Sequence, residues 1–417
     1  MDLPINRNVP TIMHIDLNSC FATAEQQANP LLRDKPLCVA AYNSPNSCVI
    51  SPSIEAKKLG IKVGMQVRDA RLIYKNVIIR TPDPPKYRDI HQKFCKIFRD
   101  YSPNVTPKSI DEAVIDFNNV PAIKRGLVEI GREIKRRMRK EIGEWISCSI
   151  GIAPNRFLAK LGASLHKPDG LDVITYENLE EVYGKVNLID LCGINTRFQA
   201  RLNAYGISTP LEFLQAKCET LQHQVFKSIC GYYWYLRLRG WEIDAVDFSR
   251  KSYGHQYALQ RHTSDPQELY PMLMKLCEKT GRRLRRSENV AYGVHVSCVY
   301  NDHTYWHQSK TFRTPLYTTT DLYIKAILIF NNQPERKKVS QLAVSCFYLV
   351  PTEPEQLDLF YDLSSKKKKV SEATDKINDK YGEFVITPAR MMGMKDTILD
   401  RVAFGGVKEL EDLYGHS

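Results

Sequence analysis

The chain has 417 residues, of which 43% are hydrophobic and 25% are charged, which is the balance of an ordinary globular protein. This composition excludes a largely disordered chain, and the length predicts about two to four domains. No apolar run reaches the ~20 residues that a membrane-spanning helix needs, and the first residues lack the pattern of a secretory signal. We therefore expect a cytoplasmic protein.

The charge balance indicates the kind of partner, and the cysteine spacing indicates the redox compartment. The 59 Lys and Arg residues exceed the 47 Asp and Glu residues by 12, and such an excess favours an anionic partner. The 11 cysteines are scattered singly along the chain, without the paired spacing of a zinc site. We expect free thiols, as in a reducing compartment.

The first part of the chain alternates between strand and helix patterns. In chain order, the sequence predicts a strand at 11–16, a helix at 18–29, β structure around a loop at 37–51, a helix at 54–59, a helix at 87–101, a strand at 114–117, an amphipathic helix at 122–144, a strand at 147–153 and a helix at 154–165. This alternation indicates an α/β or α+β domain.

The remainder divides into three stretches of different character. Residues 188–241 read as short helices, and residues 253–350 return to mixed structure. In that mixed region we expect helices at 269–286 and 321–330 and strands at 294–299 and 341–349. After Pro351 the composition changes, so we expect a linker followed by a tail with one helix from about 369 to 381.

Three carboxylates are candidates for a metal site. Asp16 ends the first predicted strand, and Asp111 and Glu112 open a later one just after Ser109. Neighbouring residues in a strand point to opposite faces, so Asp111 and Glu112 reach one site only at a strand end. Carboxylates gathered there suit Mg²⁺, and two such ions support phosphoryl transfer. Acidic residues solvated at turns are the alternative on spacing alone.

Four segments in order carry a family resemblance: DLNSCFA at 16–22, SIDEA at 109–113, GIAPNRFLAK at 151–160 and KPDG at 167–170. Together they resemble the signatures of the Y-family translesion DNA polymerases, and Asn18 is similar to the bacterial UmuC-type (polymerase V-like) branch. The resemblance implies an α+β multidomain fold shaped like a right hand. Its expected parts are a palm at 1–18 and 81–172, small fingers at 19–80, a helical thumb at 173–244, an α/β little finger at 245–351 and a C-terminal tail at 352–417.

The resemblance also implies residue roles at the active site. Asp16, Asp111 and Glu112 match the catalytic carboxylates that bind two Mg²⁺ ions, and Leu17 matches a main-chain carbonyl ligand. The positions that match contacts to the incoming deoxynucleoside triphosphate are Phe21, which is the steric gate under the sugar, and the phosphate-facing residues Ser51, Lys57 and Lys160. Ile54 departs from the family, since many members have a tyrosine at that position.

DNA contacts are expected from two regions. The segment LCGIN at 191–195 and the later Gly206 resemble the thumb's helix–hairpin–helix, in which backbone N–H groups face phosphate. Gly193 and Asn195 lie in its turn. Residues 245–350 carry 15 Lys and Arg against 8 Asp and Glu. In this region a cluster of arginines is expected to hold phosphates without reading bases, and it consists of Arg282, Arg283, Arg285 and Arg286.

The segment QLDLF at 356–360 resembles the bacterial sliding-clamp binding motif. Leu357, Leu359 and Phe360 would fill an apolar groove, and Gln356 would fix the register. A weak contact of this kind gains strength by tethering to a DNA-bound clamp. An apolar patch packed on the little finger is the alternative. Residues 384–394 carry no interpretable pattern, and accessory subunits or a recombinase filament are candidate partners of the tail.

The function that this pattern favours is a template-directed DNA polymerase that uses primer–template DNA and deoxynucleoside triphosphates. Small fingers enclose the base pair less, so we expect low fidelity and tolerance of damaged templates. Two alternatives stay open. One is a catalytically inactive, clamp-docked accessory protein of the same fold, and the other is a metal-dependent nuclease.

Overall fold

The computed structural model describes residues 3–246, 250–352, 363–394 and 397–398. The chain divides into two compact units, Met1–Asp247 and Phe248–Asp400, each of which is described by itself. Within the described residues, no helix has both the length and the apolar character needed to cross a membrane.

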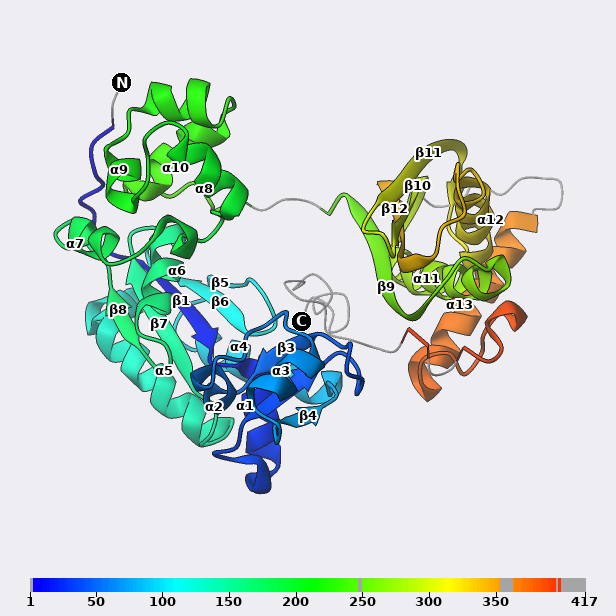
Figure 1. Cartoon of the computed structure of the whole chain (residues 1–417), viewed down its shortest axis with the longest axis horizontal. Helices are drawn as coiled ribbons and strands as arrows, with labels where there is room; N and C mark the ends of the chain where they lie inside the picture. Colours follow the sequence, from blue (N-terminus) through cyan, green and yellow to red (C-terminus); the bar gives the residue numbers. More distant parts are fainter. Residues whose placement is uncertain (1–2, 247–249, 353–362, 395–396, 399–417) are drawn as a thin grey trace. The chain divides into compact units, whose positions relative to one another are not determined.

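A five-stranded sheet forms the centre of the first unit (Figure 1), with strand order β5-β6-β1-β7-β8. β1 lies antiparallel between β6 and β7. The strands are β1 (Ile12–Leu17), β5 (Val105–Pro107), β6 (Glu112–Asp116), β7 (Cys148–Ala153) and β8 (Leu171–Val173). β5 and β8 were not predicted, because three residues are too few to show an alternating pattern.

Helices cover both faces of this sheet. Ile15 of β1 lies in one buried cluster with Phe94 and Ile134, whereas Ile12 lies in another with Leu158. Because side chains alternate along a strand, odd-numbered residues of β1 face α4 and α5, and even-numbered residues face α6. The helices of this part are α1 (Cys20–Ala28), α4 (Pro84–Arg99), α5 (Leu127–Glu141) and α6 (Arg156–Leu165).

The amphipathic helix expected at 122–144 is broken near its start. Pro121–Arg125 forms a 3-10 helix, Gly126 has φ +82°, and α5 begins only at Leu127. A positive φ is readily available to glycine and interrupts the helical hydrogen-bond ladder. The helix propensity of these residues alone did not predict this interruption.

The region expected as fingers contains a small three-stranded sheet, with strand order β3-β2-β4. Its apolar core is small and includes Cys38, Ala40, Ile61 and Val67. Its elements are η1 (Pro30–Leu32), β2 (Leu37–Ala40), β3 (Val49–Pro52), α2 (Ile54–Lys58), α3 (Val67–Ile73) and β4 (Ile78–Arg80). A body this small has no long helix with which to enclose a substrate.

The region expected as a thumb is helical, as the sequence predicts. Phe213, Phe226 and Trp234 stack in its core, with ring centroids 5.6–6.4 Å apart. Its helices are α7 (Leu179–Gly184), α8 (Thr196–Asn203), α9 (Pro210–Gln215) and α10 (Cys230–Leu238), with a 3-10 turn at Leu188–Asp190 and a π-helical turn at Thr220–Val225.

The second unit is a four-stranded antiparallel sheet, with strand order β11-β10-β12-β9. Helices α11 and α12 pack on one of its faces (Figure 1). The elements are β9 (Ser252–Thr263), α11 (Pro266–Arg286), β10 (Asn289–Tyr300), β11 (Tyr305–Leu316), α12 (Thr319–Phe330) and β12 (Val339–Pro351). β9 and β11 were not predicted, because these edge strands are largely exposed and carry few apolar residues.

The tail helix α13 (Leu363–Tyr381) begins earlier than the sequence predicted. The lysine run that starts at Lys366 therefore lies inside a helix and not in a linker. Lysine is a good helix former, and carboxylates farther along α13 anchor it to α11, as described below. A 3-10 turn at Ala389–Met391 follows, with Met391 buried.

Candidate active site

The acidic residues come together at the adjoining ends of β1 and β6. In the antiparallel register, Asp16 lies directly opposite Glu112. Asp111 is the residue before β6, and its carbonyl accepts a hydrogen bond of 2.9 Å from the Leu17 amide. Asp111 and Glu112 therefore lie at the end of a strand, where the sequence analysis predicted that both could reach one site.

His14 joins this acidic pair on the sheet face that α6 covers. Ligand atoms of His14, Asp16 and Glu112 all lie within 4.8 Å of one another. His14 is 2% exposed, and its Nε2 lies 3.6 Å from Glu112 Oε2 and has no hydrogen-bond partner. A buried nitrogen without a partner is costly, so this atom marks a place suited to a ligand.

Asp111 is held by a hydrogen bond from Ser109, and the residue before it contacts His91. The Ser109 hydroxyl donates a hydrogen bond to Asp111 Oδ1. Burial raises the pKa of Asp111, and the neighbouring charges of Asp16 and Glu112 raise it further. Behind this loop, the His91 ring nitrogen Nδ1 lies 3.0 Å from the Ile110 carbonyl oxygen. Nearby positive charge would favour the ionised form of this carboxyl.

Two lysines neutralise the other carboxylates. Lys160 Nζ, from α6, donates to Glu112 Oε2 at 2.7 Å, and Lys167 Nζ donates to Asp16 Oδ2 at 2.6 Å. Burial alone would raise the pKa of Glu112, but His14 and Lys160 beside it lower that pKa to about 2. The carboxylate of Glu112 is therefore ionised at neutral pH and available as an oxygen ligand.

Lys57 and Ser51 lie at the edge of this cluster. Lys57, in the last turn of α2, is exposed, yet partial loss of water and then the charge of Lys167 lower its pKa. Asp16 and Asp111 act on the same ammonium group in the opposite direction. Ser51 is buried, and its hydroxyl accepts a hydrogen bond of 3.4 Å from the Ala22 amide at the start of α1.

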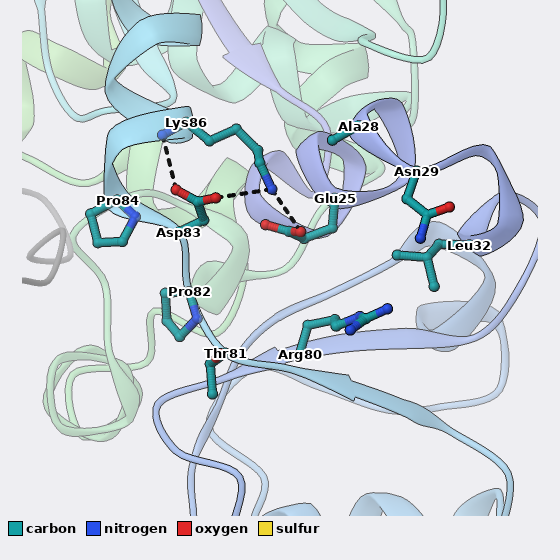
Figure 2. A pocket seen from close by; sticks show the side chains of 10 residues that line it. All are labelled: Glu25, Ala28, Asn29, Leu32, Arg80, Thr81, Pro82, Asp83, Pro84 and Lys86. Atoms are coloured by element: carbon teal, nitrogen blue, oxygen red, sulfur yellow. Dashed lines mark hydrogen bonds and ion pairs between the residues drawn. The ribbon is translucent and has the colours of Figure 1, made fainter.

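Phe21 is supported by residues that the sequence did not single out. Its ring stacks on Tyr87, whose hydroxyl donates to Glu25 Oε1 at 2.9 Å. Glu25 Oε2 in turn accepts from Lys86 Nζ at 2.9 Å, and Lys86 also pairs with Asp83. Figure 2 shows Lys86 reaching between these two carboxylates in a pocket beside α1. The Phe21 ring is thereby tied to α4.

Comparison with known proteins shows the family of the chain. Residues 15–164 match the impB/mucB/samB family, and residues 250–359 match the C-terminal domain of that family. DNA polymerase IV of Pelotomaculum thermopropionicum is 30% identical, with 91% of this chain and 94% of the relative covered. DNA polymerase IV of Moorella thermoacetica is 32% identical, with 90% and 94% covered.

The chain belongs to the Y family of DNA polymerases.

Solved structures agree with this assignment. A Y-family DNA polymerase chimera of Dbh and Dpo4 matches with a TM-score of 0.72 at 25% identity, covering 82% of this chain and 99% of that chain. DinB from Sulfolobus solfataricus has the same fold, with a TM-score of 0.54 at 24% identity over 82% of this chain and 99% of that chain. The predicted right-hand α+β fold is confirmed.

The comparisons do not confirm the predicted branch within the Y family. Both relatives are named DNA polymerase IV, so the UmuC-type assignment stays a prediction. Asn18, on which it rests, is buried, and its side-chain amide donates to Ser147 Oγ at 3.1 Å. The Ser149 hydroxyl donates to Asn18 Oδ1 at 3.0 Å. In this polymerase Asn18 therefore ties the end of β1 to the start of β7.

The turn in the region expected as a thumb lies around Gly193 and Asn195. Asn195 has φ −100° and caps α8 by accepting a hydrogen bond from the Phe198 amide at 2.9 Å. Gly193 takes the positive φ of +100°, and Gly206 has φ +75°. The turn geometry is thus supplied by glycines, and Asn195 serves as a helix cap.

The arginine cluster of the second unit is placed differently from the prediction. Arg282 and Arg285 are 4% and 7% exposed, and they pair with carboxylates of α13. Arg283 donates to the Gly254 carbonyl at 3.2 Å, and Arg286 is exposed and paired with Asp379. Burial requires that guanidinium groups be neutralised. Arg282 and Arg285 therefore face α13 and not solvent.

Some residues with predicted roles lie outside the described part of the chain, and the sequence analysis missed other residues of the site. The clamp-motif residues Gln356, Leu357, Leu359 and Phe360 fall in 353–362, which the structure does not describe. The sequence held a signal for His14, which shares a strand face with Asp16, and for Lys167, which lies in the KPDG segment. It held none for Tyr87, because its contact with Phe21 joins residues 66 apart.

Proposed function

We propose that this Y-family polymerase adds deoxynucleotides to a primer 3′ end at the carboxylate site of the palm. The observation that carries the proposal is the pairing of Asp16 with Glu112 across β1 and β6, with Asp111 in the residue before β6. The lysines around this group, Lys57 and Lys160, suit the charge of a triphosphate. The primer hydroxyl would attack the α-phosphate, and pyrophosphate would leave.

The acidic group has the donor chemistry for Mg²⁺, which prefers carboxylate oxygens and keeps positions for water and phosphate. The unpartnered, buried Nε2 of His14 faces the same group and supports a cation there. We propose that Asp16, Asp111 and Glu112, with the Leu17 carbonyl, hold two ions. Bound there, the ions would supply the positive charge that two-metal nucleotidyl transfer requires.

The chain's own residues would bind and select the nucleotide. Lys160 is held at 2.7 Å from Glu112 and is within reach of phosphates that approach the carboxylates. Lys57 offers a point charge from the neighbouring α2, and Ser51 offers a hydroxyl at the start of α1. Phe21, 6% exposed, would act as a wall under the sugar that collides with a 2′-hydroxyl group.

Primer–template DNA would be held without base reading. We propose that the turn around Gly193 and Asn195, with Gly206, presents backbone N–H groups of the thumb to phosphate. On the second unit, Arg283 and Arg286 are the less buried members of the arginine cluster. Contacts of this kind depend on salt and tolerate any sequence, as a copying enzyme requires.

The small fingers favour translesion synthesis with low fidelity. α2 and α3 span only 5 and 7 residues, so the region offers few groups that could discriminate between transition states. Misincorporation should be frequent on undamaged templates, and extension should continue past an abasic site. High fidelity together with a full block at the lesion would contradict this proposal.

We also propose that the QLDLF segment at 356–360 docks on the bacterial sliding clamp. Substituting Leu359 and Phe360 with alanine should remove the stimulation by the clamp and leave basal extension unchanged, while equal losses in both would contradict docking.

Asn18 supports a UmuC-type branch, in which accessory subunits or a recombinase filament would be partners. Efficient extension by the purified chain alone would contradict an obligate accessory partner.

Primer extension with Mg²⁺ and deoxynucleotides tests the proposed reaction. We expect extension by the wild-type chain and none by Asp111→Ala. An exposed aspartate serves as a matched control: Asp100→Asn removes only a surface ion pair with Arg137, which contributes little. Shortening of the primer would favour a nuclease, and an inactive wild-type chain that still binds the clamp would favour an accessory protein.

A further inference from the structure

The tail helix α13 docks on α11 through carboxylates that lie on one of its faces. Asp375 Oδ1 accepts from Arg285 at 2.9 Å, and its other oxygen accepts from the same guanidinium at 2.5 Å. Asp379 Oδ1 accepts from Arg282 at 2.7 Å and also pairs with Arg286. These ion pairs fix which face of α13 points toward α11.

The residues after α13 continue along the same surface of α11. The Lys275 ammonium donates to the Met394 carbonyl at 2.6 Å and lies 4.9 Å from the centre of the Phe384 ring. Lys279 lies 5.7 Å from the same ring centre and 3.9 Å from Glu383. Positive charge on this side of α11 is thus directed toward the tail.

A second side of α13, which is exposed to solvent, is basic. The helix carries six lysines and three carboxylates within 363–381, and the carboxylates face inward. Lys366, Lys369, Lys376 and Lys380 are exposed and follow one another at spacings of 3, 7 and 4 residues, which places them on one side of a helix. Lys369 and Lys376 form no ion pair with the described residues.

We propose that this outward lysine face of α13 is a binding surface for the phosphate backbone of duplex DNA. From Lys366 to Lys380 the face is about 21 Å long at ~1.5 Å per residue, which equals the rise of about six base pairs along the duplex axis at ~3.4 Å each. Lysines on flexible stems act as point charges that follow phosphates without reading bases. α13 therefore carries basic charge outward in place of the arginines that it covers.

The proposal rests on the family assignment, which supplies duplex DNA as a ligand, and is independent of the proposed metal site. Charge complementarity selects DNA over a protein partner. An acidic protein is the competing occupant, because Val370 and Tyr381 are 65% and 63% exposed beside the lysines. The two occupants respond differently to loss of charge and to loss of apolar area, so variants separate them.

DNA binding by the full chain tests the proposal. A short, blunt-ended, fluorescently labelled duplex is titrated by anisotropy, with EDTA present and nucleotides absent, between about 50 and 200 mM salt. The double variant Lys369→Gln/Lys376→Gln should bind more weakly, and the slope of log K against log salt should fall by about one per lysine. The matched control Lys369→Arg/Lys376→Arg should keep the wild-type slope.

The outcomes are distinct. An unchanged affinity and slope in the glutamine variant would overturn the proposal, and so would equal weakening in Val370→Ser/Tyr381→Ser. Circular dichroism of each variant checks that the helix content is kept, and charge reversal at Lys369 and Lys376 provides a second variant with a larger expected loss. Since no metal or nucleotide is present, failure of the polymerase reaction would leave these readings unaffected.

Discussion

The Phe21 ring lies flat on the Tyr87 ring, with centroids 4.3 Å apart and an angle of 13° between the planes. Both residues are buried, and Tyr87 is fixed in turn by the hydrogen bond from its hydroxyl to Glu25. A ring that is stacked and packed in this way has little freedom to yield. We infer that α4, through Tyr87, sets the position of the proposed steric gate.

Loss of either ring should weaken discrimination against ribonucleotides. We expect Phe21→Ala to lower the ratio of kcat/KM for deoxy- over ribonucleotide by at least about tenfold, or ~1.4 kcal/mol. Tyr87→Leu should have a smaller effect in the same direction, because Phe21 stays but loses its support. Tyr87→Phe keeps the stack and should remain near wild type. Single-nucleotide insertion kinetics measure this ratio, and an unchanged ratio in Phe21→Ala would contradict the gate.

The stability of the protein should depend on pH through His91, which lies behind the loop that carries Asp111. Burial lowers the pKa of His91, which contacts the Ile110 carbonyl next to Asp111. Because its folded pKa lies below the unfolded value of about 6.5, the unfolded chain takes up the proton first as pH falls. The contribution to the free energy of unfolding is therefore complete above about pH 6.5 and decreases below it.

Urea unfolding at several pH values checks this sign. The wild-type free energy of unfolding should fall between about pH 7.5 and 5.5, and the fall should be shallower in His91→Gln, which keeps a donor but does not titrate. Equal pH slopes for the two proteins would show that His91 is not a neutral, buried group.

Gly151 should not tolerate a side chain. A Cβ atom at this position in β7 would lie 1.9 Å from the Ala159 carbonyl oxygen and 2.3 Å from the Ala163 amide nitrogen. We expect Gly151→Ala to push α6, and with it Lys160, away from the sheet, at a cost of about 1–3 kcal/mol or more. Gly184→Ala is the control, since its Cβ would only touch Leu211 at 3.7 Å. Thermal unfolding and primer extension report the two effects.

Docking of α13 should depend on Asp375. Removing its charge leaves the buried guanidinium of Arg285 with only the more distant carboxylate of Glu278, 4.0 Å away, and breaking a buried ion pair typically costs about 3–5 kcal/mol. We expect Asp375→Ala to release α13, which hydrogen exchange would register as lost protection in 366–381. Lys376→Gln, on the outward face, should leave that protection unchanged. Retained protection in Asp375→Ala would show that other contacts suffice to hold the helix.

The elements that the sequence predicted are those with a strong local signal. β1, β6 and β7 are apolar strands, and α11 is a long amphipathic helix, so alternation and helical periodicity were sufficient. β11 escaped prediction because its exposed, polar residues are stabilised by pairing with β10 and not by an apolar pattern of their own. Pairing between distant strands is a tertiary effect, which a local window does not contain.

The candidate site residues could be predicted where short sequence segments follow one another in the order typical of a family. Asp16, Asp111 and Glu112 could be named because four segments matched a family, and their approach follows from the register of β1 and β6. The partners of Arg282 and Arg285 lie 97 and 90 residues farther along the chain. Nothing in the local arginine pattern indicates that these residues would be buried under α13.

Asp16, Asp111 and Glu112 should form one centre for divalent cations. Electron paramagnetic resonance with Mn²⁺, which accepts the same oxygen ligands as Mg²⁺, tests it directly in the presence of primer–template DNA and a non-hydrolysable nucleotide. We predict two protein-dependent Mn²⁺ ions for the wild type and for Asp100→Asn, and loss of at least one in Asp111→Asn/Glu112→Gln. Equal Mn²⁺ binding by the double variant would contradict the account.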